Sequence, residues 1–260
     1  MKKGMLLALV LILSQSITGN AFGLGAELAV GGWQQSLGGT LGYEIDDSDD
    51  IIDLGEDFDF DDELRLFGRA NIDLPLFFPN IYLVAAPMEF DGTGSKSIQI
   101  SYGDVEFAAD AELDAVLTMN QYDISLYWGI PALKTATNGI LNVDVGINVR
   151  IIDLEASLSG EEAATSAIVK ESVSETVPLP MLYVAFQIEP IDEFAIAVEG
   201  RGLSIGDNKL YSIIGRLRYQ FAGPVFAAAG YRFDTVEIDE EDILVDIDFS
   251  GPFAEIGLIF

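Results

Sequence analysis

Apolar and polar side chains alternate with a two-residue period along three long segments of this chain. In residues 63–74, aliphatic and small side chains share one face and mainly charged or amide side chains share the other; residues 139–152 and 209–221 repeat the pattern. Because successive side chains of a strand point to opposite faces, this period predicts β-strands. Weaker alternation predicts seven further strands, at residues 24–34, 80–90, 120–130, 179–189, 194–205, 225–236 and 245–260.

The connections between these ten segments alternate in length. Short turns at one end and long loops at the other are typical of outer-membrane β-barrels. The sequence therefore predicts an all-β fold, a closed antiparallel up-and-down transmembrane β-barrel of about ten strands. A barrel of eight or twelve strands remains an alternative. We expect residues 97–117 to form a surface hairpin, but they could instead form one more membrane-crossing pair of strands. The short connections are residues 75–79, 131–138, 190–193 and 222–224. The connections at the other end are residues 44–62, 91–119, 153–178, 206–208 and 237–244, and all of these except 206–208 are longer.

Alternation alone does not separate a barrel from a secreted acidic β-sandwich, because the strands of a sandwich alternate as well. The arginines after residue 21 favour the barrel, since all seven lie in the polar register of their strands. An arginine that faces lipid at the midplane costs about 2–4 kcal/mol. Carboxylates share this register. We therefore expect a lumen that holds a charge network of Arg65, Arg69, Asp73, Asp144, Arg150, Glu199, Arg201, Arg216, Arg218, Arg232 and Glu255.

This network has two interpretations. Paired charges would fill and rigidify a narrow lumen, whereas a ladder of arginines would line an anion-selective path. Barrels of about eight strands are just filled by side chains, while those of about 16 strands leave an aqueous channel. A ten-stranded barrel therefore favours the filled lumen.

The first 21 residues have the order of a secretion signal. Lys2 and Lys3 precede an apolar run at residues 5–13, and a polar stretch follows that ends at Ala21. The run is too short for a membrane anchor, which needs about 20 apolar residues. We expect residues 1–21 to be a cleaved signal peptide and residues 22–260 to form the barrel, located in the cell outer membrane.

Composition removes several classes of function. The chain has 43 acidic and 13 basic side chains, a formal charge of −30, and neither histidine nor cysteine. Ser-His-Asp triads, histidine-based acid–base catalysis, ordinary zinc sites and thiolate nucleophiles are therefore excluded. Nucleic acid is not an expected partner, because phosphate affinity depends on clustered lysine and arginine. We expect no enzymatic activity and no resident cofactor.

Acidic residues are densest between residues 44 and 63, which hold twelve carboxylates and no base. Asp57, Asp59 and Asp61 have the 1-3-5 spacing of a calcium loop, but Asp62 stands where glycine is needed and Gly68 where glutamate is needed. A solvated acidic loop is therefore favoured over loosely bound Ca²⁺ or Mg²⁺. A second acidic cluster, residues 234–248, includes Asp239 and Asp242 and contributes to the same cation hypothesis, in which both loops share ions with lipopolysaccharide phosphates.

The chain ends in Phe260, preceded at two-residue steps by Leu258 and Ile256. This ending resembles the signal by which outer-membrane proteins are passed to the barrel-insertion machinery. Further stretches resemble the outer-membrane protein family named for its occurrence alongside the GlyGly-type C-terminal sorting system. The resemblance implies a bacterial outer-membrane β-barrel and brings no catalytic residues. The matching stretches are Trp33 and residues 90–94, 178–183, 202–208, 210–211 and 249–253.

Together these features predict a monomeric outer-membrane barrel with acidic extracellular loops, of a structural or surface-interaction type. Outer-membrane lipid, lipopolysaccharide and the insertion machinery are its expected partners. One alternative is a small channel or transporter for ions or hydrophobic solutes, and the other is the secreted acidic β-sandwich.

Overall fold

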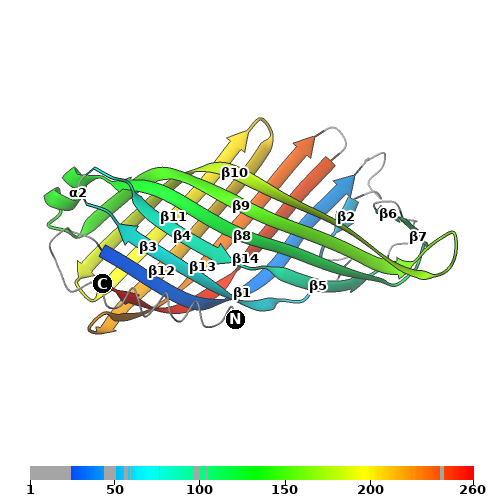
Figure 1. The fold of residues 1–260 in the computed structure, drawn as a ribbon, viewed down its shortest axis with the longest axis horizontal. Coiled ribbons are helices and arrows are strands. Elements are labelled where there is room, and N and C mark those ends of the chain that lie inside the picture. Colours follow the sequence, from blue (N-terminus) through cyan, green and yellow to red (C-terminus); the bar gives the residue numbers. More distant parts are fainter. Residues whose placement is uncertain are drawn as a thin grey trace, which may run out of the picture.

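The structure is a computed structural model in which residues 25–43, 51–55, 58, 60–75, 77–95, 100–102, 105–240 and 243–260 are described. The expected signal peptide lies outside these residues. Long antiparallel strands wrap into a barrel (Figure 1). Its strands are β1 (Gly25–Tyr43), β3 (Glu63–Asp73), β4 (Asn80–Ala86) with β5 (Glu89–Gly94), β8 (Leu113–Gly129), β9 (Leu141–Glu161), β10 (Ile168–Ile191), β11 (Phe194–Ile205), β12 (Asn208–Ala222), β13 (Val225–Glu240) and β14 (Ile243–Ile259).

Each barrel strand pairs with its neighbours in the chain, and β14 pairs with β1 to close the sheet. This seam runs from Glu27 opposite Ile259 to Tyr43 opposite Ile243. The strands β4 and β5 both pair with β8 and form one crossing, interrupted at Pro87, which has no backbone N–H to donate. The prediction of ten strands is confirmed, and closure excludes the β-sandwich.

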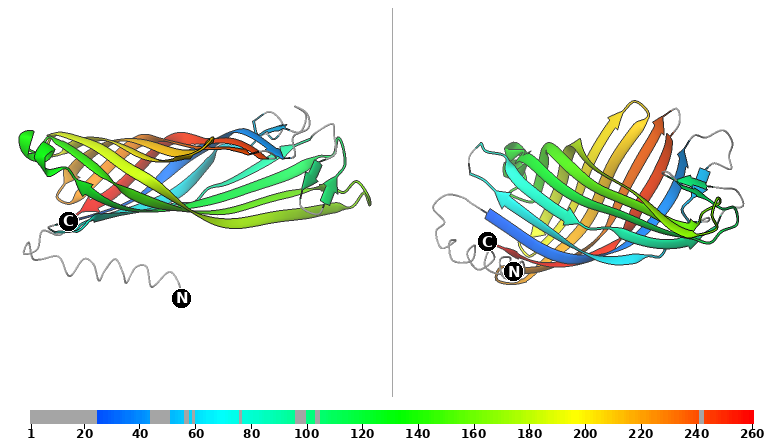
Figure 2. Two further views of the ribbon diagram at one scale, coloured as in Figure 1. Left: turned by 90° about the horizontal axis from the view of Figure 1, so that it is seen from above. Right: turned by 45° about the vertical axis from the view of Figure 1, so that its right-hand side comes forward.

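The two ends of the barrel differ. The end of β14 and the short connections, including α2 (Pro131–Ala136), lie at one end, called here the turn end (Figure 2). At the other end β9 and β10 project as a long hairpin, so the predicted loop at residues 153–178 is wrong. The ladder continues until Ile168 faces Glu161. The sequence pattern did not predict these extensions of β9 and β10, because polar side chains occur on both of their faces. A strand shows clear alternation only when one face is apolar and the other polar.

Two shorter features lie at this far end. The strand β2 (Ile51–Asp53) pairs with β1, and β6 (Ile100–Tyr102) pairs with β7 (Val105–Phe107) in a separate sheet. The surface hairpin expected within residues 97–117 is therefore present but smaller. Its last residues belong to β8, which starts at Leu113.

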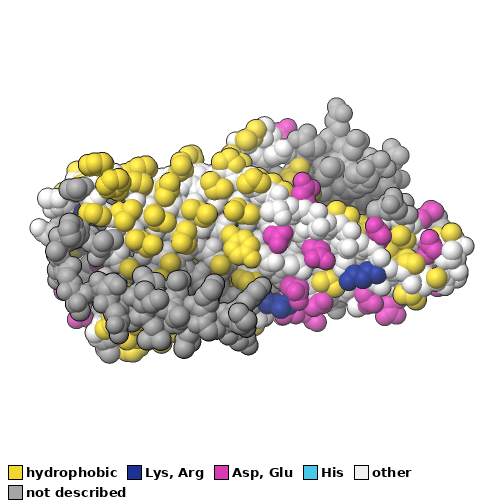
Figure 3. Space-filling model, in the orientation of Figure 1, with side chains coloured by type: hydrophobic (Ala, Val, Ile, Leu, Met, Phe, Trp, Pro, Cys, Tyr) yellow, Lys and Arg dark blue, Asp and Glu magenta, His cyan; other side chains and the backbone are white. Residues whose placement is uncertain are grey.

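Apolar side chains cover the outside of the barrel toward the turn end, and carboxylates gather on the projecting end (Figure 3). This band follows strand parity. On β12, Ile213 and Leu217 are exposed, whereas Ile214 and Arg216 between them are buried in the lumen. The same alternation on the neighbouring strands makes an apolar exterior around a polar interior.

Aromatic residues at predicted strand ends are divided between the two faces. Tyr122, Trp128 and Tyr231 are exposed on the outer face. Tyr82 and Phe90 are buried inside the barrel, so they do not face the membrane surface as interfacial aromatic residues would. Their parity matches that of the lumen residues. Among the described residues, no helix is long and apolar enough to span a membrane.

Candidate functional site

The described barrel strands bring the arginines of alternate positions into the lumen. Arg69, Arg150, Arg201, Arg216 and Arg232 are buried there. A buried guanidinium is tolerated only when carboxylates and hydrogen-bond acceptors surround it. The lumen supplies these in two clusters.

The first cluster, near the turn end, is called the turn-side cluster and consists of Glu27, Arg69, Glu199, Arg216 and Glu255. The Nη2 atom of Arg69 lies 2.7 Å from Oε1 of Glu255, and the same guanidinium pairs with Glu27. Arg216 pairs with Glu199, and its Nε atom lies 3.1 Å from Oε1 of Glu255. Five strands, β1, β3, β11, β12 and β14, are thereby tied together across the lumen.

Arg218 extends this cluster toward the turn end. Its guanidinium bridges Glu27, at 2.7 Å, and Glu189, at 2.9 Å. The side chain also lies over the ring of Phe226, at 5.9 Å from the centroid. Arg218 thus connects the buried charges to the open end of the lumen.

The second cluster, called the mid-barrel cluster, consists of Asp123, Arg150, Arg232 and Asp234. Arg150 donates two parallel hydrogen bonds to Asp123, of 2.9 and 3.0 Å. Arg232 donates to Asp234 at 2.6 Å, and its guanidinium lies 4.4 Å from the ring centroid of Trp33. Such bidentate, charge-assisted bonds are stronger than neutral ones and fix the orientation of the guanidinium.

Arg201 is also buried in the lumen. Its Nη2 atom lies 3.3 Å from Oε2 of Glu199, and its guanidinium lies 5.3 Å from the ring centroids of both Tyr82 and Tyr183. Its Nε and Nη1 atoms are buried without a hydrogen-bond partner among the described residues. Cation–π contacts with two aromatic rings therefore supply part of its stabilisation.

Apolar side chains fill the rest of the lumen beside the mid-barrel cluster. They form one packed group, called the apolar plug, in which the rings of Phe90 and Phe249 lie 5.7 Å apart. A small cavity of about 20 Å³ lies beside Trp33 and Phe253. The plug consists of Trp33, Leu54, Ala86, Met88, Phe90, Met119, Ile152, Ile214, Ile247, Phe249 and Phe253.

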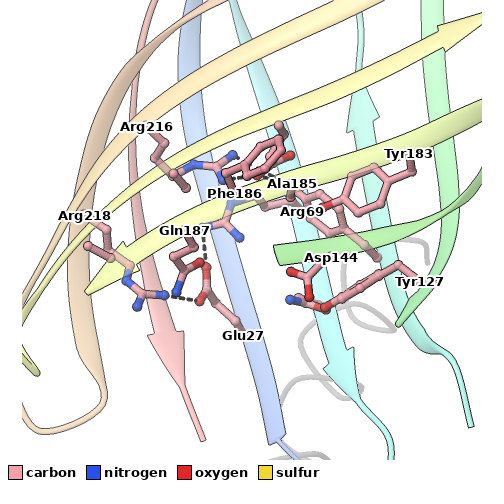
Figure 4. Close-up of a pocket in the computed structure, with 15 residues that line it drawn as sticks. Glu27, Arg69, Tyr127, Asp144, Tyr183, Ala185, Phe186, Gln187, Arg216 and Arg218 are labelled. Carbon is pink, nitrogen blue, oxygen red and sulfur yellow. Dashed lines mark hydrogen bonds and ion pairs between the residues drawn. The ribbon is translucent and has the colours of Figure 1, made fainter. Parts of the chain in front are cut away.

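Toward the turn end the lumen opens into a polar cavity of about 570 Å³, called the vestibule. A smaller cavity of about 60 Å³ lies deeper, between Asp144 and Tyr127 on one side and Arg218 and Glu27 on the other (Figure 4). The two cavities share several lining residues, including Tyr127 and Asp144. Beyond them the side chains of the charged clusters and the plug close the lumen.

The structure places the predicted charge network as follows. Nine of its members take part in ion pairs, including Arg65, whose Nη2 atom lies 3.2 Å from Oε1 of Glu89. Asp73 and Asp144 line the vestibule and make no ion pair within the described part of the chain. Asn142 donates to both carboxylate oxygens of Asp144, at 2.9 Å each, and Tyr127 lies 3.5 Å from Asp73.

Three essential partners were not among the predicted site residues: Glu27, Asp123 and Asp234. Glu27 and Asp123 lie on strands with weak alternation, although each has the parity of the lumen face. Asp234 was assigned to an acidic loop, which is wrong. The strand β13 continues to Glu240, so Asp234 lies inside the barrel beside Arg232.

The predicted cation site is largely outside the described residues. Asp57, Asp59 and Asp242 are not described, and of Asp239 only the backbone is. Asp61 is exposed. Within the described ranges, no three acidic side chains are grouped as a metal site would require.

Phe260 lies at the turn end beside the seam between β14 and β1. Its backbone N–H donates to the carbonyl of Ala26 at 2.8 Å, and the N–H of Ala26 donates back at 3.2 Å. The last residue therefore extends the pairing that closes the barrel.

Comparison with known proteins gives the fold but no family. No family model matches the chain, and no curated protein matches it. The outer membrane protease OmpT from Escherichia coli superposes with a TM-score of 0.57 at 10% identity, covering 94% of this chain and 100% of OmpT. This chain has the fold of an outer-membrane β-barrel. The translocator domain of the autotransporter NalP from Neisseria meningitidis also matches, with a TM-score of 0.45 and 12% identity over 99% of this chain and 95% of that domain.

Proposed function

We propose that this chain is a non-conducting outer-membrane barrel that holds an acidic β-hairpin above the membrane for contact with other molecules. The observation that carries the proposal is the filled lumen. Two clusters of ion pairs and an apolar plug follow one another inside a barrel of ten strands. An occluded lumen leaves the exterior and the projecting end as the working surfaces.

The projecting end supports this role because it is a built structure. The hydroxyl of Tyr102 donates to the carbonyl of Ala156 at 2.8 Å, which fixes the β6–β7 hairpin against β9. Phe58, Phe107 and Leu158 pack together there. Residues 153–177 of the β9–β10 hairpin carry six carboxylates and one lysine. An ordered, strongly negative platform suits recognition of cationic groups.

We propose the outer membrane as the location of this barrel. The apolar exterior satisfies the requirement for a lipid-facing surface, and the pairing of β14 with β1 closes the sheet. Membrane lipid, lipopolysaccharide and the insertion machinery are the proposed partners, with Phe260 as the insertion signal. We propose a monomer, and membership of the GlyGly-associated family remains part of this proposal.

We propose no catalytic activity. OmpT is a protease, but a likeness at 10% identity concerns the fold alone. The chain has no histidine or cysteine to act as a general base or thiolate. The carboxylates of the two lumen clusters are engaged by arginines.

We expect no steady conductance when the purified barrel is inserted into planar lipid bilayers. Packed apolar side chains and ion-paired side chains of the described residues fill the lumen, so we expect no continuous water-filled path through it. Single-channel recording at symmetric salt checks this expectation, with a porin in the same bilayers as the positive control. A stable open level carried by most inserted molecules would show instead that the barrel is a channel.

A further inference from the structure

The projecting part of β10 has a neighbouring strand on one side only. Its ladder with β9 runs from Ile168 to Ile188 without a register shift. Its pairing with β11 begins only at Leu182, opposite Gly202. Over the described residues, no strand pairs with that other side of β10 between Ile168 and Met181. In Figure 1 the far end of the β9–β10 hairpin lies well apart from β11. This part of β10 is therefore an edge strand.

The register shows which backbone groups of this edge point away from β9. In an antiparallel ladder, residues that bond to the partner strand alternate with residues whose N–H and C=O point outward. Just before β10, the carbonyl of Ala167 accepts from the N–H of Glu162. Near the other end, the N–H of Glu189 donates to the carbonyl of Ile140. Odd-numbered positions therefore bond to β9, and even-numbered positions point outward. The outward N–H groups of the projecting part belong to Ile168, Lys170, Ser172, Ser174 and Thr176.

Two prolines limit how far this edge can pair. Pro178 and Pro180 take the next two even-numbered positions, where an N–H would point outward, and proline has none. Strand addition is therefore blocked next to the barrel and open over residues 168–176, called here the free edge. The side chains of residues 172–176 are exposed, and Val173 is 51% exposed. An exposed row of outward N–H and C=O groups is a template for pairing with another chain.

The charge of the hairpin determines which kind of strand fits the free edge. Residues 153–177 carry six carboxylates and one lysine. Glu171 and Glu175 share one face of β10, with Val173 between them. Lys170 lies on the other face. A second copy of this chain would bring an equal negative charge against the edge, and like charges on adjacent strands are destabilising. A strand with lysine or arginine at every second position instead places opposite charges beside the two glutamates.

We propose that the free edge binds an extended cationic segment of another protein by strand addition. This inference rests on the proposed function, because it names the kind of partner that the acidic hairpin contacts. Main-chain hydrogen bonds to the even-numbered positions provide affinity, and the alternating basic side chains provide selectivity. The hydrogen bond from Tyr102 to the carbonyl of Ala156 holds β9 in place beside β10, so this side of the ladder is ordered before the partner arrives.

Fluorescence anisotropy of a labelled peptide tests this site on the full barrel in lipid nanodiscs. The peptide alternates lysine with threonine over nine residues, the length of the free edge from 168 to 176. We expect saturable binding that weakens with added salt, and no binding of the peptide that alternates glutamate with threonine. The same lysine peptide with every backbone amide N-methylated keeps its charges but cannot donate main-chain hydrogen bonds. It should bind at least about tenfold more weakly, because several such bonds are lost.

Variants of the free edge test the same point from the side of the barrel. Ser174→Pro removes an outward N–H from the middle of the edge and leaves the donors to β9 in place, so it should weaken binding of the lysine peptide about tenfold. Ser174→Ala is the matched control, because it keeps the N–H and should bind as the unmodified chain does. Glu175→Gln should weaken binding about two- to fivefold, as expected for one ion pair at the surface.

A heat-dependent gel shift confirms that each variant is folded, and the N-methylated peptide remains a test on the unmodified chain if Ser174→Pro does not fold. Equal binding of the lysine peptide and its N-methylated form, or unchanged affinity in Ser174→Pro, would overturn strand addition but leave the acidic hairpin as a contact surface. Absence of lysine-peptide binding would overturn the inference together with the role of the hairpin toward cationic partners. Self-association of the barrel that Ser174→Pro abolishes would assign the edge to a second copy and also overturn the inference. Conductance is measured separately, so none of these results bears on the filled lumen.

Discussion

Replacing Arg216 by methionine should destabilise the barrel more than any surface substitution. Arg216 is the only cation that contacts Glu199 and Glu255 together among the described ion pairs, and it also lies over the ring of Phe253. Methionine keeps much of the volume but leaves buried carboxylates short of a partner. Breaking a buried pair by removing one member costs about 3–5 kcal/mol. Urea unfolding in lipid vesicles, followed by the heat-dependent gel shift, measures this loss.

Lys209→Met is the matched control on the same strand. Lys209 lies 2.5 Å from Glu237, but the Lys209 side chain is exposed and that of Glu237 is about one-third exposed, and pairs at the surface contribute about 0–1 kcal/mol. The double variant Arg216→Met with Glu199→Gln should recover part of the lost stability, because one unpaired charge is removed. Equal, small losses for Arg216→Met and Lys209→Met would show that the turn-side cluster does not stabilise the barrel.

Replacing Trp33 by alanine should produce the second large loss of stability. Trp33 is 1% exposed, packs in the apolar plug and lies under the guanidinium of Arg232. Large-to-small substitutions of a buried aromatic residue cost about 3–5 kcal/mol, because a cavity remains and the cation–π contact is lost. The same urea titration measures the change, with the gel shift as its signal.

The chain's other tryptophan provides the control. Trp128 is 47% exposed on the outer face, and its indole N–H donates to the carbonyl of Phe77 at 3.1 Å. Trp128→Ala should cost less than half as much as Trp33→Ala, since it opens no internal cavity. A loss for Trp128→Ala as large as that for Trp33→Ala would mean that the plug is not tightly packed.

The period of the sequence predicted the barrel well because membrane-facing strands have a strong contrast between their faces. Residues 209–221 alternate so clearly that their lumen side, with Arg216 and Arg218, could be assigned from parity alone. The projecting part of the β9–β10 hairpin could not be found this way. Water contacts both faces of the hairpin there, so neither face has to be apolar. Apolar and polar residues therefore do not alternate clearly in this part of the sequence.

The partners of the arginines were harder to predict than the arginines. Arg69 and Glu255 are 186 residues apart and meet only because β14 closes on β1 in a particular register. A local pattern contains no information on that register. Asp73 and Asp144 show the converse, because they have the expected parity but lie at the open end of the lumen, where no arginine reaches them.

Spin labelling along β12 tests the central claim most directly, and the natural absence of cysteine makes single labelling sites simple to introduce. Nitroxides at positions 212, 213, 214, 215, 217 and 218 would be compared in lipid vesicles for collisions with lipid-soluble oxygen. We expect high oxygen accessibility at 213, 215 and 217 and low accessibility at 212, 214 and 218. Uniform accessibility along the strand, or the opposite alternation, would contradict a barrel with a lipid-facing exterior and charges confined to its filled lumen.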